Sequence, residues 1–164
     1  MLAQDKEALR TGLQTKALAI RERELNLYHD SLNAVGTQAA LFTGFAFHAL
    51  VDFEIPEGKS ERLVAWFTLS VVFTLVLNLN CVVHVISVCV WGPGLALRGS
   101  SHNAMFRAVE GMQQERLRAF QVGFIGTVGI HIATSSMAFI AFDDVLAGTV
   151  AVIVAFSIAS SAYT

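Results

Sequence analysis

A stripe of seven residues near the start of the chain has the residue types and the spacing to select a cation. Its members recur at intervals of three or four residues: Asp52, His48, Phe45, Leu41, Thr37, Asn33 and His29. In an α-helix such intervals keep side chains roughly on one face. The stripe is therefore acidic at one end, apolar in its middle and polar at the other end.

If several copies surrounded an axis, a ring of Asp52 carboxylates would concentrate cations at the outer mouth of a pore. Charged rings and hydrophobic constrictions are the usual parts of a selective, gated pore, and Ca²⁺ takes several carboxylate oxygens as ligands. Asp52 is thus a candidate Ca²⁺ ligand as part of an oligomeric ring. Spacing alone leaves open, and favours, an ordinary alternative in which Asp52 faces water just beyond the lipid or caps the turn with Lys59.

His48 also has an ordinary alternative, because a polar residue in a membrane span more often bonds to a neighbouring helix than lines a pore. An ionisable group inside a membrane is nevertheless a candidate functional residue. In a cation path a protonated His48 would oppose permeation, and it could therefore act as a brake when the pH falls.

Hydrogen bonds between helices explain the remaining polar residues of the hydrophobic stretches. These residues are Asn78, Asn80, His84, His131, Thr134, Ser135 and Ser136. No Glu-x-x-His pair occurs, so we expect no tightly bound haem or metal cofactor. We also expect no enzyme activity, because the chain has no HExxH motif, no Gly-rich phosphate loop and no Ser–His–Asp order in a loop. Gly126 and Gly129 predict a helix that packs closely against a neighbour.

The elements that must position the stripe are hydrophobic helices. Hydrophobic residues make up 54% of the 164 residues and charged residues only 15%, against about 25% charged in a typical soluble domain. Four stretches without Asp, Glu, Lys or Arg cover residues 31–51, 63–97, 119–142 and 145–164. Each has the ~20 residues that a helix needs to cross a bilayer core. We therefore predict an all-α integral membrane protein with four transmembrane helices, at about 33–53, 62–91, 119–142 and 145–163.

Residues 1–30 are predicted to form a cytosolic amphipathic helix that extends the first span, and residues 31–164 the four-span membrane domain. The apolar residues of this helix share one stripe: Leu2, Leu9, Leu13, Ile20 and Leu27. Gly92-Pro93-Gly94 predict a kink or an end of the second span. The mixed-charge residues 98–118 are expected to connect it to the third.

The distribution of Lys and Arg places both termini on one side of the membrane, which we expect to be the cytosol. The N-terminal segment carries five of these residues and the 98–118 segment four Arg, whereas the opposite side carries only Lys59 and Arg62. We expect the plasma membrane, with an organellar membrane as the alternative. The net charge of -2 provides no basic field that would attract nucleic acid.

Two segments of the chain resemble the Orai family, the pore subunits of calcium release-activated calcium channels. Residues 40–52, ALFTGFAFHALVD, are similar to the family's first span, in which Gly-Phe-Ala and a terminal Val-acid pair close the pore helix. Residues 85–91, VISVCVW, and nearby Pro93 resemble the inner end of its second span. A third segment, QERLR at 114–118, is similar to the loop before its third span.

The resemblance implies a hexamer built around the first span. Asp52 would hold the place of the acidic selectivity filter, Phe45 that of the hydrophobic gate residue, and Leu41 would line the same pore. His48 stands where an apolar gate residue is usual, and the family's basic inner pore positions fall on His29, Asn33 and Thr37. The span-two His of the family falls on Asn80.

The leading hypothesis is therefore a homo-oligomeric, Orai-like cation channel subunit embedded in membrane lipid, with Ca²⁺ as the permeant ion. A regulatory membrane partner is a further expectation, although the cytosolic helix on which the family's reticulum calcium sensor docks has no counterpart after the fourth span. The alternative is a non-conducting structural or scaffold subunit of a larger complex. A channel would place the stripe on a symmetry axis, whereas a scaffold would place it against protein or lipid.

Overall fold

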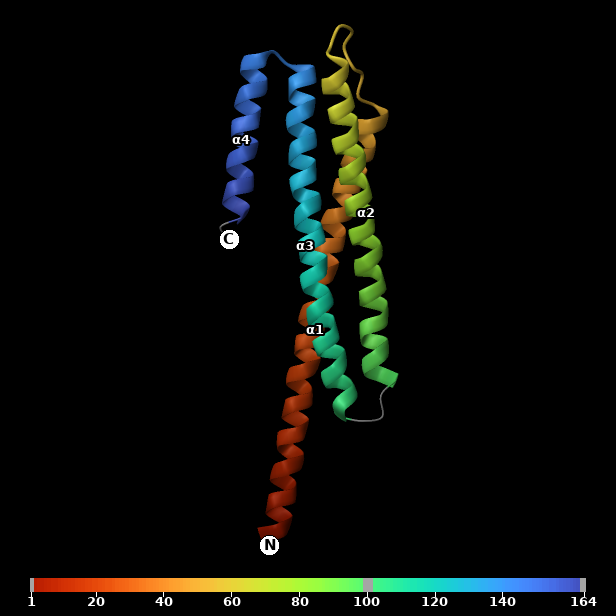
Figure 1. The fold of residues 1–164 in the computed structure, drawn as a ribbon. Coiled ribbons are helices and arrows are strands. Elements are labelled where there is room, and N and C mark those ends of the chain that lie inside the picture. Colours follow the sequence, from red (N-terminus) through yellow and green to blue (C-terminus); the bar gives the residue numbers. More distant parts are fainter. Residues whose placement is uncertain (1, 99–101, 163–164) are drawn as a thin grey trace. The chain divides into compact units, whose positions relative to one another are not determined.

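The computed structural model describes residues 2–98 and 102–162, in which the regular secondary structure is α-helical and no strand occurs (Figure 1). Four helices follow one another along the chain: α1 (Leu2–Val51), α2 (Glu61–Arg98), α3 (His102–Ala141) and α4 (Asp144–Ala162). The predicted all-α class with four helices is confirmed.

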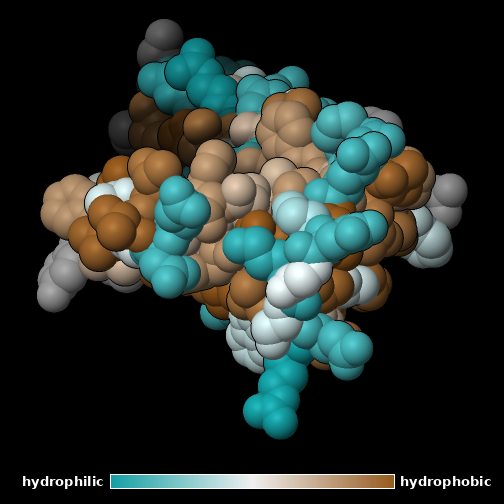
Figure 2. All heavy atoms as spheres, turned by 90° about the horizontal axis from the view of Figure 1, so that it is seen from above, coloured by the Kyte–Doolittle hydropathy of each residue, from teal (hydrophilic) through white to brown (hydrophobic). Residues whose placement is uncertain are grey.

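Three of the helices are long and apolar enough to cross a membrane, over the stretches Gln4–Val51, Glu61–Gly92 and Phe106–Ala141. α4 is a shorter apolar helix. Its 19 residues extend about 28 Å at 1.5 Å per residue, close to the ~30 Å of a bilayer's hydrocarbon core. Figure 2 shows apolar side chains exposed at the surface beside hydrophilic ones. These features are those of a four-helix membrane protein.

Contacts along the chain define two compact units, and each of the first three helices contributes to both. The first unit comprises Met1–Val35 and His84–Ala119, and the second comprises Gly36–Val83 and Phe120–Thr164. α1 runs from one unit into the other without a break. The expected helical continuity between the N-terminal extension and the first span is therefore confirmed.

The connection between α2 and α3 differs from the expectation of a long polar linker. α2 continues through Gly92-Pro93-Gly94 to Arg98, and α3 begins at His102, so most of the 98–118 segment is helical. A proline inside a helix removes one backbone hydrogen bond, but the helix is supported here by packing. Gly92 is buried, and a Cβ atom added to it would lie 2.5 Å from Sδ of Met112. Close packing of α2 against α3 therefore outweighs the local helix-breaking signal.

In the second unit, α1, α2 and α3 share one apolar core. Its buried members are Ala46 from α1, Phe67 and Val71 from α2, and Ala133 and Ile140 from α3. The small Ala46 and Ala133 allow the helices to approach one another, because association inside a membrane depends on close van der Waals packing. This core fixes which face of α1 the chain itself covers.

α2 and α3 also approach closely at two glycines, as predicted. A Cβ atom on Gly126 would lie 2.7 Å from Oδ1 of Asn78, and one on Gly129 would lie 2.7 Å from Oγ1 of Thr74. Asn78 and Thr74 are buried and each donates to a backbone carbonyl of its own helix, so their polar groups are held in place.

The buried face of α1 is marked by residues that recur every seven positions. They are Leu25 and Leu32 in the first unit and Ala39 and Ala46 in the second. Seven residues are close to two helical turns, so these side chains share one side of the helix. The predicted apolar stripe lies elsewhere: Leu9, Leu13, Ile20 and Leu27 are exposed, and the side chain of Leu2 lies outside the described residues.

Candidate functional site

The acidic end of the stripe is formed by the last turn of α1. The backbone N–H of Asp52 donates to the carbonyl of His48 at 2.9 Å, just beyond the helix end at Val51. The Asp52 carboxylate contacts Nδ1 of His48 one turn earlier, and the two side chains are 57% and 77% exposed. Lys59 instead donates from Nζ to the carbonyl of Phe139 at 3.4 Å. The structure thus pairs Asp52 with His48, and Lys59 with α3.

Phe45 and Leu41 continue the stripe with exposed apolar side chains, 60% and 57% accessible. Leu41 precedes the buried Ala46 by five residues, which correspond to about 140° around a helix. Ala46, and Ala39 two turns before it, therefore lie on roughly the opposite side of α1 from the stripe. The part of the stripe from Leu41 to His48 is therefore the face of α1 that the second unit leaves largely uncovered.

A groove of about 400 Å³ lies beside this face within the second unit. Phe45 and His48 of α1 line this groove together with Asp52 just beyond the helix end, and Thr134 and Met137 of α3 also line it. Most of the lining is apolar, and the imidazole and the carboxylate lie at the exposed edge of the groove.

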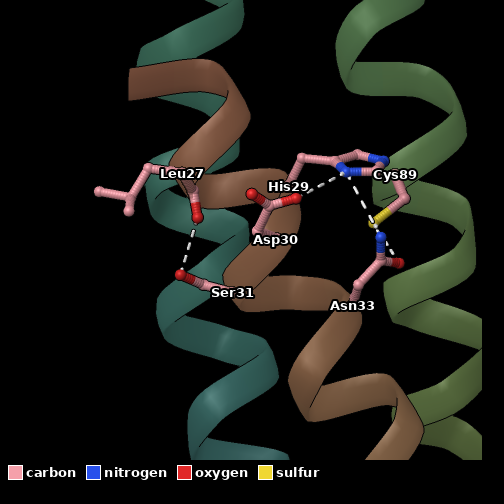
Figure 3. Close-up of polar contacts among 6 residues, drawn as sticks. All are labelled: Leu27, His29, Asp30, Ser31, Asn33 and Cys89. Atoms are coloured by element: carbon pink, nitrogen blue, oxygen red, sulfur yellow. Dashed lines mark hydrogen bonds and ion pairs between the residues drawn. The ribbon is translucent and has the colours of Figure 1, made fainter. Parts of the chain in front are cut away.

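The inner part of the stripe lies differently. In the first unit, Asn33 and His29 are close to Cys89 of α2 (Figure 3). Sγ of Cys89 donates to Oδ1 of Asn33 at 3.8 Å, Nδ2 of Asn33 lies 3.4 Å from Nδ1 of His29, and that nitrogen lies 3.8 Å from Oδ1 of Asp30. Each step of four residues turns about 40° beyond a full rotation. From Leu41 through the exposed Thr37 to Asn33, the stripe therefore turns gradually around α1, and Asn33 lies on the side that contacts α2.

Sequence reasoning missed a second charged cluster, which joins α2 to α3 in the first unit. Nε2 of His84 lies 3.2 Å from Oε2 of Glu115, and both atoms are buried but not aligned as a hydrogen bond. Arg118 donates to the other oxygen of Glu115 at 2.8 Å. The guanidinium of Arg116 stacks on the Tyr28 ring at 5.0 Å from its centroid. No sequence spacing signals the His84–Glu115 and Arg116–Tyr28 contacts, because their partners lie on different helices, whereas Arg118 and Glu115 are three residues apart on α3.

The expectation of hydrogen bonds between helices holds for His131, whereas other predicted members donate to carbonyls of their own helices: Asn78, Asn80, Thr134, Ser135 and Ser136. Nε2 of His131 lies 3.3 Å from Oγ of Ser157 on α4, and its Nδ1 lies 2.7 Å from the carbonyl of Thr127 on its own helix. This contact joins α3 to α4 in the second unit.

No group of three or more His, Cys, Asp or Glu side chains that could hold a metal ion occurs among the described residues of the chain. One chain therefore presents at most two such ligands at the acidic end of the stripe. A Ca²⁺ site at Asp52 would need carboxylates from several copies, since Ca²⁺ takes six to eight oxygen ligands.

Comparison with known protein families gives one match over most of the chain. The family Orai-1, described as mediator of CRAC channel activity, matches residues 17–162. Searches of curated proteins and of solved structures gave no significant match. The family match covers most of α1 and the whole of α2, α3 and α4, and it agrees with the resemblance found in residues 40–52. The chain therefore belongs to the Orai-1 family, a family of calcium-channel membrane proteins.

Proposed function

We propose that the chain is the subunit of a homo-oligomeric cation channel in which α1 lines a central pore and Asp52 forms an acidic ring at its outer mouth. Membership of a family of mediators of CRAC channel activity supports this proposal. One structural observation carries it further. Asp52, His48, Phe45 and Leu41 lie on an exposed face of α1, while Ala39 and Ala46 pack on the opposite side.

The residues of this face suit the stages of cation passage. Asp52 would attract the ion and bind it through oxygen atoms contributed by several copies. Phe45 and Leu41 would form a hydrophobic constriction that closes by excluding water. Ca²⁺ is the permeant ion that a ring of carboxylates favours. A hexamer, cytosolic termini, a plasma-membrane location and a regulatory membrane partner belong to the same proposal.

The scaffold function remains the second candidate, because one observation favours it. Asn33, at the inner end of the stripe, accepts a hydrogen bond from Cys89 of α2 within the same chain, and His29 contacts Asn33. A residue held by its own chain is less available to line a pore. In a scaffold, the exposed face of α1 would pack against protein or lipid without conducting ions.

Calcium flux into liposomes that contain the purified protein tests the proposal. Asp52→Ala removes the acidic ring, so we expect Ca²⁺ selectivity over Na⁺ to fall by about tenfold or more. Glu57→Ala is the matched control, because Glu57 is an exposed carboxylate of the same loop outside the stripe, and its selectivity should match that of the wild type. If the intact, oligomeric wild type conducts no cation, the channel proposal fails and the scaffold function replaces it.

A further inference from the structure

At the C-terminal end of α1, a ring nitrogen and a carboxylate oxygen converge on one point of the protein surface. Nδ1 of His48 and Oδ2 of Asp52 are in direct contact across one helical turn. Two potential ligand atoms on successive turns of the chain are therefore already held side by side.

The two atoms are the ligand types that a borderline transition metal prefers. Zn²⁺ binds an imidazole nitrogen at about 2.0–2.1 Å and a carboxylate oxygen at about 2.0–2.2 Å. Residues four apart on a helix face the same side, which is the spacing by which helical metal sites present two ligands. Ca²⁺ and Mg²⁺ take oxygen ligands, so the imidazole shifts the preference of the pair toward Zn²⁺.

The surroundings leave room for the rest of a coordination shell. His48 and Asp52 line the groove of about 400 Å³, which also carries the hydroxyl-bearing Thr134. The chain supplies two protein ligands, so the remaining positions of a tetrahedral Zn²⁺ would be filled by water. Both ligating side chains are more than half exposed, so an ion can reach them directly.

We propose that His48 and Asp52 of one chain chelate a divalent transition-metal ion, with Zn²⁺ as the representative ion. On binding, the metal ion lies between Nδ1 of His48 and Oδ2 of Asp52, and any proton on Nδ1 passes to solvent. The site is formed within one chain and does not depend on conduction. Its consequence does rest on the proposed function: Zn²⁺ held at Asp52 would occupy the acidic ring and inhibit Ca²⁺ flux.

Equilibrium dialysis of the purified full-length chain against Zn²⁺ tests the site. We expect the dissociation constant for Zn²⁺ to rise by about tenfold or more in both His48→Leu and Asp52→Asn, because each change removes one of the two protein ligands. His131→Gln is the matched control, since His131 is another histidine of the second unit whose nitrogens contact Thr127 and Ser157. Its Zn²⁺ affinity should equal that of the wild type, and an excess of Ca²⁺ should not displace the metal.

A second measurement needs no variant. Co²⁺ bound through nitrogen and oxygen ligands gives visible absorption bands, and Zn²⁺ should abolish them at one equivalent per chain. Equal Zn²⁺ affinity in the wild type, His48→Leu and Asp52→Asn would overturn the site, as would a wild type that gives no Co²⁺ bands. If Zn²⁺ binds but no flux occurs, the channel proposal fails while the site stands. If Ca²⁺ flux occurs and Zn²⁺ does not bind, the site alone fails.

Discussion

Gly126 is one of the residues at which α2 and α3 approach closely. A Cβ atom on it would lie 2.7 Å from Oδ1 and 2.9 Å from Nδ2 of Asn78. Asn78 is 1% exposed, and its Nδ2 donates to the carbonyl of Thr74 at 2.8 Å. The amide therefore cannot move aside without breaking a buried hydrogen bond, which makes the position sensitive to a single methyl group.

Gly126→Ala should lower the stability of the protein. Overpacking costs about 1–3 kcal/mol, and the better helix propensity of Ala offsets about 1 kcal/mol of that. We therefore expect a net loss of about 1 kcal/mol in the free energy of unfolding and a lower Tm in detergent. Gly148→Ala is the control, because no atom lies within 4 Å of the added methyl group, and its Tm should stay equal or rise slightly. Equal melting of the two variants would contradict this packing.

At the scale of the helix, α1 carries two apolar faces that have different roles. Leu25 and Leu32 are buried within the first unit, whereas Leu27 is 60% exposed. Leu27 lies fourteen residues before Leu41 and twenty-one before His48, so these residues share one heptad position. The exposed apolar face of the extension is therefore in register with the face proposed to line the pore.

Leu32→Ala and Leu27→Ala should separate these roles. Leu32 is fully buried, so its truncation should reduce the free energy of unfolding by about 2–5 kcal/mol, as measured by thermal or denaturant unfolding in detergent. Leu27→Ala should leave that stability nearly unchanged and instead lower the fraction of oligomer seen by native mass spectrometry. The reverse pattern of effects would show that the two faces have been assigned the wrong way round.

The helices themselves could be predicted because uncharged stretches of about 20 residues have few alternatives in a chain of this size. The long helical parts of α2 and α3 beyond the spans could not, because residues such as Arg116 gain their support from Tyr28 on another helix. The sequence also could not show which of the two apolar faces of α1 is buried. Burial of Leu32 depends on the first unit as a whole, which no spacing within one helix reveals.

At the scale of the whole molecule, the candidate site was predictable in its residues but not in its contacts. The order of Asp52, His48, Phe45 and Leu41 along one face followed from helical geometry. The pairing of His48 with Asp52 depends on side-chain conformation, and the burial of His84 against Glu115 depends on the packing of α2 on α3. The function also depends on several copies, so it belongs to an assembly that one chain's sequence does not describe.

An assembly built around α1 would bring the Leu27 side chains of neighbouring copies together near the axis. In a chain whose Cys81 and Cys89 are replaced by Ser, Leu27→Cys should therefore form disulfide-linked dimers in membranes under mild oxidation, as measured by non-reducing electrophoresis. Glu22→Cys is the matched control. Glu22 is also exposed on α1, but it lies about 140° around the helix from Leu27 and should cross-link much less. Equal cross-linking at both positions would mean that the Leu27 face of α1 does not point toward an axis. The proposal that the same face lines the pore would then be contradicted.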